Sequence, residues 1–105
     1  MRRRRRNRIA KVLRAAQHGR CAYCQRRLTT STRPGGRPYW NTETIEHLQR
    51  RAEGGTDRLE NLALVCYECN SLRGSMPWVL FATIRQRHVR SLERMLAYCN
   101  GWRPG

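Results

Sequence analysis

Acidic residues are scarce in this chain. Seven aspartates and glutamates stand against 22 lysines and arginines in 105 residues, which gives a formal net charge of +15. Lysine is nearly absent as well, because Lys11 is the single one. Such an excess repels itself unless it meets a polyanion, and a planar guanidinium suits phosphate better than an ammonium does. The composition favours a nucleic-acid partner over two alternatives, a solvated basic surface or an arginine bias inherited from a GC-rich genome.

Long apolar runs are missing too. No stretch approaches the ~18 apolar residues of a membrane span, so we expect no membrane partner. The first residues, MRRRRRNR, resemble the start of a signal peptide, but Lys11 and Arg14 interrupt the apolar segment that should follow. We therefore expect a cytoplasmic protein, associated with the nucleoid or made in a phage-infected cell, and not a secreted one. In that reducing setting, cysteines serve metal binding or catalysis more often than disulfides.

The chain has the length of one small domain with a thin core, since 39% of its residues are hydrophobic. Such domains often need a disulfide or a metal for stability. Residues 1–8 form a basic run that we expect to be a tail, frayed without a partner, before a single domain at 9–105. Apolar residues then recur on one face of a predicted helix: Ile9, Val12, Leu13 and Ala16.

Two short strands are predicted further along, at about Glu43–His47 and at Leu62–Cys66, with a polar loop between them that bends at Gly54-Gly55. A longer helix follows at about 77–99. Its apolar residues lie near one face: Leu80, Ile84, Leu92, Met95 and Leu96. Its arginines lie largely off that face, where they could follow a nucleic-acid strand: Arg85, Arg87, Arg90 and Arg94.

Four of the five cysteines form two C-x2-C pairs, Cys21 with Cys24 and Cys66 with Cys69. Two thiolates at this spacing can share one tetrahedral zinc ion, and two such pairs fill its shell, which makes a structural site. Two disulfides or unrelated buried thiols are the alternatives. The 41 residues between the pairs exceed the gap of a simple zinc ribbon, so other elements are inserted there. We expect Cys99 to be a small buried apolar residue rather than a fifth ligand.

Three candidate catalytic or metal-binding residues lie in this insert, Glu46, His47 and Asn61, and a fourth, Asn70, follows the last cysteine of the second pair. A neutral imidazole can take a proton from water. A carboxylate oxygen and an amide oxygen can hold a hard divalent ion, and oxygen ligands favour Mg²⁺ or Mn²⁺ over zinc. Alone, His47 is better explained as an ordinary histidine at the end of a strand.

Together these residues resemble the HNH endonuclease motif in its zinc-stapled form. The resemblance rests on CAYC and on IEHLQRRAEGGTDRLENLALVCYECNSLRG, and it covers residues 21–74, about half of the chain. It implies an α+β fold with a small ββα-metal core and a four-cysteine zinc site, flanked by an N-terminal helix and a longer C-terminal one.

The resemblance also implies a role for each matching residue. His47 is the general base that activates water, and Glu46 is the acidic ligand of the catalytic ion. Asn61 steadies the loop and thereby the histidine, Asn70 binds the ion at the start of the α element, and Arg73 lies near the scissile phosphate. Two departures are that the family's acid is often aspartate, and that its last motif residue is often histidine rather than asparagine.

Basic residues outside the motif are candidates for binding nucleic acid. The predicted contacts are Arg2, Arg3, Arg4, Arg5 and Arg6 in the tail, with Arg50 and Arg51 after the histidine. Contacts to phosphate are mostly blind to sequence. We expect a double-stranded DNA substrate, nicked by a monomer, and a protein partner is possible. The alternative is a zinc-stapled module that binds nucleic acid without catalysis.

Overall fold

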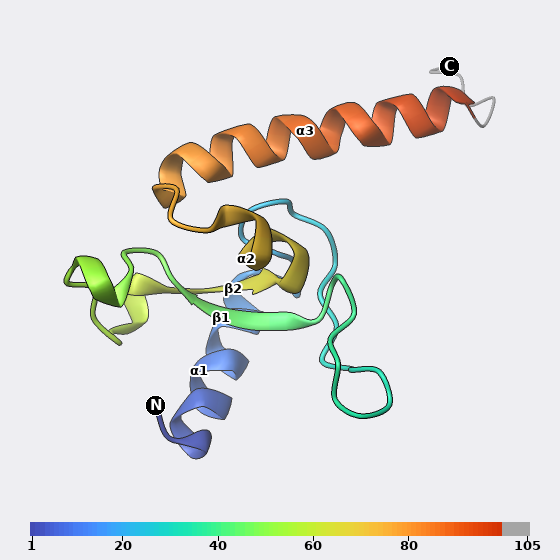
Figure 1. Ribbon diagram of the computed structural model, residues 1–105. Coiled ribbons are helices and arrows are strands. Elements are labelled where there is room, and N and C mark those ends of the chain that lie inside the picture. The colour runs from blue at the N-terminus through green and yellow to red at the C-terminus, as the bar shows by residue number, and fades with distance from the viewer. Residues whose placement is uncertain (100–105) are drawn as a thin grey trace.

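The computed structural model describes residues 1–99, apart from the side chains of residues 93 and 96–99. Its centre is a two-stranded antiparallel sheet made of β1 (Glu43–His47) and β2 (Leu62–Cys66). The register pairs Glu43 with Cys66 at one end and His47 with Leu62 at the other. Both strands have the predicted bounds, and the α+β class is confirmed. Helices lie on the two sides of the sheet (Figure 1).

Helix α1 (Arg3–Ala16) covers one side of the sheet. Its buried Leu13 packs with Leu62 and Leu64 of β2, because alternate residues of a strand face the same side. The helix begins six residues before the predicted start at Ile9, so most of the basic run is helical rather than frayed. Arginine is a good helix former, and Arg5 donates a hydrogen bond of 3.0 Å to the backbone oxygen of Asp57.

The other side of the sheet carries α2 (Tyr67–Arg73) and the cysteines. Helix α2 follows β2 without a loop, and Cys66 is its N-cap, with the sulfur accepting a hydrogen bond from the backbone N–H of Cys69. Tyr23 is fully buried there and meets Phe81 edge to face, with the ring centres 5.0 Å apart. Position 70 is thereby set against Thr44 near the start of β1, and position 73 against His47 at its end.

Helix α3 (Trp78–Cys99) crosses over α2 and extends well beyond the sheet (Figure 1). Phe81, Arg85 and Val89 face the core. The predicted apolar face is exposed at the positions that the structure describes: Leu80, Ile84, Leu92 and Met95. The helix is therefore held by the residues that face the cysteine cluster and not by its apolar stripe. Among the described helices, none combines the length and the apolar character that a membrane span needs.

The loop between the strands holds two short 3-10 helices, η1 (Arg51–Glu53) and η2 (Leu59–Asn61). The loop closes where the backbone N–H of Leu48 donates to the oxygen of Asn61, at 2.8 Å. Gly55 must be glycine here, because a Cβ atom would lie 1.8 Å from the backbone oxygen of Gln49. This close approach folds the loop back beside the end of β1.

Candidate active site and zinc centre

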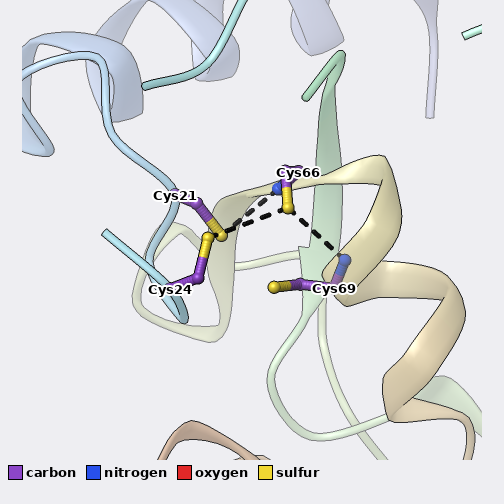
Figure 2. A group of neighbouring side chains, drawn as sticks. All are labelled: Cys21, Cys24, Cys66 and Cys69. Carbon is purple, nitrogen blue, oxygen red and sulfur yellow. Dashed lines mark hydrogen bonds between the residues drawn. The ribbon is translucent and has the colours of Figure 1, made fainter. Parts of the chain in front are cut away.

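The four predicted cysteines form one buried cluster in which the ligand atoms all lie within 4.8 Å of one another. Figure 2 shows the sulfurs turned toward one another, from the segment after α1 and from the junction of β2 with α2. Backbone N–H groups donate to two of the sulfurs, among them that of Cys66 to Cys21 at 3.3 Å. Four cysteine thiolates in this arrangement can fill the tetrahedral shell of a structural zinc ion.

Two arginines surround this cluster, which the sequence did not predict. Nε of Arg26 donates to the sulfur of Cys24 at 3.2 Å, and Nε of Arg85 donates to that of Cys69 at 3.3 Å. Both guanidinium groups also bond Glu68, and although burial opposes it, they lower the pKa of this carboxyl. Four thiolates exceed the charge of one divalent ion by two, and the arginines offset that excess. Arg85 is therefore turned inward and not free to follow a nucleic-acid strand.

Arg26 is held on its other side by a ring. The guanidinium carbon lies 4.2 Å from the centre of the Trp40 ring, a cation–π contact. The backbone oxygen of Trp40 accepts from the N–H of Glu68 at 3.0 Å, so the segment before β1 is tied to α2 at the zinc centre. The fifth cysteine, Cys99, has a side chain outside the described part of the structure, so its predicted burial is not tested.

A separate hollow of about 360 Å³ opens at the end of β1. Several of the predicted site residues meet in its lining: Glu46, His47, Asn70, Arg73, Arg50 and Arg51. Glu46 and His47 are consecutive on a strand and start toward opposite sides of the sheet. They reach the same hollow because His47 is the last residue of β1.

His47 is oriented by an acid that the sequence analysis missed. Its Nε2 lies 2.6 Å from Oδ1 of Asp57, which also bonds Arg51. These two partners lower the pKa of Asp57 to about 2, so the carboxylate is ionised at neutral pH. An ionised carboxylate accepts a hydrogen bond, so Nε2 carries the proton and Nδ1 of the neutral ring keeps its lone pair. The missed signal was the aspartate in GGTD, one of only seven acids in the chain.

Asn61 lies behind the hollow and closes the loop that carries Asp57. Its Oδ1 accepts from the backbone N–H of Gln49 at 2.8 Å. Its Nδ2 donates to the backbone oxygens of Gln49, at 3.1 Å, and Thr56, at 2.7 Å. One amide group thus joins the residues just after β1 to those just before Asp57. Such bonds are consistent with the role predicted for Asn61, which is to steady this loop.

Asn70 reaches the hollow from α2 with a fixed amide. Its Nδ2 donates to Oγ1 of Thr44 at 3.0 Å, and that hydroxyl donates in turn to the backbone oxygen of Val65 at 3.0 Å. The bond engages the amide nitrogen of Asn70 and leaves its oxygen as the acceptor available to a cation.

Glu46 is buried beside Asn70, with 9% of its side chain exposed. Its Oε2 has no hydrogen-bond partner among the residues that the structure describes. The nearest positive charge is Nη1 of Arg73, 3.5 Å away. Burial raises the pKa of Glu46 even though Tyr23, Arg73 and His47 oppose that shift. Burial and the neighbouring Glu46 also raise the pKa of Tyr23, which stays protonated.

The position of Arg73 differs from its predicted contact with a phosphate. Only 2% of its side chain is exposed. The guanidinium donates to the backbone oxygens of His47 at 2.9 Å, Leu48 at 2.7 Å and Met76 at 2.8 Å. A further bond of 3.2 Å reaches the hydroxyl of Tyr23. With these donors engaged, Arg73 fixes the end of β1 from inside while it also lines the hollow.

The other predicted basic residues lie at the surface. Arg3–Arg6 occupy the first turns of α1, and Arg2 precedes them. Arg50 is half-buried and lies 3.7 Å from Glu53, whereas Arg51 bonds Asp57 with its side chain largely exposed. Positive charge therefore surrounds His47 on the side of the loop and on the side of α1.

The comparison with known families gives the same assignment as the motif. The model of the family described as HNH endonuclease matches residues 21–75, just over half of the chain. The chain belongs to the HNH endonuclease family. A relative, the CRISPR-associated endonuclease Cas9 of Corynebacterium diphtheriae, is 33% identical over 66 residues. That match covers 63% of this chain and 5% of the relative, so the likeness concerns one segment of a much longer protein. The HNH assignment supports nuclease activity in general terms.

We expect Arg85→Ala to weaken zinc binding about 10-fold, because loss of a group that supports a metal ligand typically has an effect of that order. Competition with a chromogenic chelator at equilibrium measures the affinity. Arg87→Ala is the matched control, since Arg87 is exposed on the same helix and carries the same charge. Equal zinc affinity in the two variants, with helix content retained, would show that the bond from Arg85 to Cys69 does not support the metal.

Proposed function

We propose that this protein is an endonuclease that hydrolyses DNA phosphodiester bonds with a divalent cation, and that His47 is its general base. The observation that carries the proposal is the hydrogen bond between His47 and Asp57, which leaves Nδ1 as the basic atom. A base with a fixed tautomer next to a carboxylate and an amide oxygen is what water activation beside a metal requires.

The residues of the hollow fit a hard cation. Glu46 offers a buried carboxylate oxygen without a hydrogen-bond partner among the described residues, and Asn70 offers an amide oxygen. Oxygen ligands of this kind suit Mg²⁺ or Mn²⁺, with water completing the coordination. When bound, the ion would stabilise negative charge on the leaving and non-bridging oxygens of the phosphate.

The chain's own groups then have separate tasks. Nδ1 of His47 takes a proton from water, the water oxygen forms a bond to phosphorus, and the bond from phosphorus to the leaving oxygen breaks as that oxygen takes a proton from solvent. Asp57 holds the ring and balances the positive charge that His47 acquires. Arg73 keeps the backbone of His47 and Leu48 in place, and Asn61 keeps the loop closed. With one such site among the residues that the structure describes, we infer that a monomer nicks one strand.

One observation favours a binding module without catalysis. Arg73 lies 3.5 Å from the same oxygen of Glu46 that would bind the cation, so the arginine partly neutralises that carboxylate without a metal. If Arg73 stayed on Glu46, the carboxylate would not bind a cation. The protein would then bind nucleic acid through its arginines and leave the phosphodiester intact. The two functions therefore differ in one measurable property: the nuclease binds a cation at Glu46, and the binding module does not.

We expect the zinc-loaded protein to relax supercoiled plasmid with Mg²⁺ or Mn²⁺, and His47→Ala to lower the rate about 10²- to 10⁴-fold, the usual contribution of a general base. Product is quantified on a gel, with EDTA as a further control. His88→Ala is the matched variant, because His88 is an exposed histidine on α3, away from the hollow. No cleavage under any metal, together with retained DNA binding, would favour the binding module.

We expect Mn²⁺ to raise the melting temperature of the wild-type protein and not that of Glu46→Gln. Because burial raises the pKa of Glu46, protonation should weaken Mn²⁺ binding at a higher pH than for an ordinary carboxylate. For the same reason, in the metal-free protein this group favours folding at low pH and opposes it as the pH rises through its pKa.

The measurement is the difference in melting temperature with and without Mn²⁺, taken at several pH values. Glu60→Gln serves as the control, because Glu60 is exposed and remote from the hollow. An equal shift of melting temperature with Mn²⁺ in Glu46→Gln and Glu60→Gln would show that Glu46 does not bind the cation, whatever the plasmid assay gave.

We expect Asp57→Asn to lower kcat about 10- to 100-fold with little change in KM, because an amide no longer fixes the tautomer of His47, although the general base itself remains. Asp57→Glu should recover part of the rate by restoring a carboxylate. Single-turnover nicking against pH measures both variants. An unchanged kcat in Asp57→Asn would show that the contact with His47 does not serve the reaction.

A further inference from the structure

A second and larger hollow, of about 890 Å³, lies between α1 and β1. We call it the α1 groove. One wall is a single face of α1, because the residues that form it recur at helical spacing: Arg6, Asn7, Ala10, Lys11 and Arg14. The other wall is β1, and the groove ends at His47 and Arg51. Helix α1 lies outside residues 21–75, which the family model matches.

The charges of the α1 groove are suited to an anion. Its one carboxylate, that of Glu43, is bonded by Arg14, with Nε at 3.2 Å. Arg6 and Lys11 are exposed, and neither is in an ion pair with any acidic residue in the described part of the chain. The walls thus carry the Arg14–Glu43 ion pair and two positive charges, Arg6 and Lys11, without an acidic partner in the described part of the chain. The amide of Asn7 lies beside Arg6. A ligand with repeated negative charges complements this arrangement better than a neutral one.

The α1 groove and the hollow at the end of β1 are neighbours that share part of their lining. Both are lined by Ile45, His47 and Arg51. His47 therefore separates a basic channel on the side of α1 from the pair of oxygen donors on the side of α2. The α1 groove thus offers a path for a strand that passes His47 with its reacting phosphate at Glu46 and Asn70.

We propose that the α1 groove holds the DNA backbone on one side of the scissile phosphate, with Arg6 and Lys11 contacting phosphates of the strand to be cut. The two residues are five positions apart, about 7.5 Å along a helix at 1.5 Å per residue. One strand of a duplex rises about 3.4 Å per nucleotide, so the two cations reach different phosphates. The assignment of the cut to His47 rests on the proposed function, whereas the binding of phosphates in the groove is tested without cleavage.

The first test measures binding of a short fluorescent DNA duplex by the full chain carrying His47→Ala, at several salt concentrations. Each lost phosphate contact lowers the slope of log K against log salt by about 0.9, so Arg6→Ala with Lys11→Ala should lower it by about 2. The matched control is Arg8→Ala with Arg37→Ala, which removes the same charge from exposed positions that lie outside the groove and are not among the predicted contacts.

A clearly smaller change of slope in the control supports the groove, and equal changes in the two double variants overturn it. Zinc content and helix content are checked in each variant, so that a folding defect is not scored as lost binding. Duplex RNA of the same sequence is the second probe. Equal slopes and an equal effect of the groove variant on RNA would overturn the assignment to DNA.

The second test locates the contact relative to the cut. In the wild-type protein, phosphate ethylation should interfere with nicking on one side of the cut only, and this asymmetric interference should be missing in Arg6→Ala with Lys11→Ala. Interference on both sides alike, or unchanged in that variant, contradicts the proposal. A wild-type chain that binds DNA with the expected salt slope and never nicks it would contradict the proposed nuclease function. It would still support phosphate binding in the α1 groove.

Discussion

The cysteine cluster is the constraint on which the remaining structure depends. All four cysteines belong to the main group of buried residues, together with Tyr23, Val65 and Phe81. A chain of 105 residues with a two-stranded sheet has few apolar contacts to spare, so a metal at this position does what a larger core does elsewhere. Cys66 ends β2 and Cys69 lies within α2, so the metal would fix the angle between the strand and the helix.

That angle decides the geometry of the site. Helix α2 carries Asn70 and Arg73, and both point at β1 through hydrogen bonds. Arg73 donates to the backbone of the last strand residue and of the one that follows it, so the position of His47 is set from α2. Loss of zinc should therefore disturb the hollow at the end of β1 even though no cysteine lies in it.

Sequence patterns predicted the elements whose signals are local. The second strand was found because LALVC is an apolar run of strand length, and the zinc centre because two residues separate the cysteines of each pair. Arg85 was misjudged, since an arginine off the apolar face of a predicted helix was taken for a surface residue, while its donors here meet a thiolate and a carboxylate. The bonds of Arg73 to carbonyl oxygens were not foreseen, because the resemblance gave only its place near a phosphate. Asp57 was missed because its partner lies ten residues away across a folded loop. The start of α1 gave no periodic signal, because arginines fill every position of its first turn.

The arginines of this chain thus divide by what they bond. Arg14, Arg26, Arg73 and Arg85 satisfy carboxylates, thiolates or carbonyl oxygens and belong to the fold. Others, such as Arg6, lie exposed without an acidic partner among the described residues. Arginine stays charged at all relevant pH values, so this second group repels itself in the free protein. A polyanion in the α1 groove would relieve that repulsion and stabilise the folded chain by binding it, which couples substrate binding to stability.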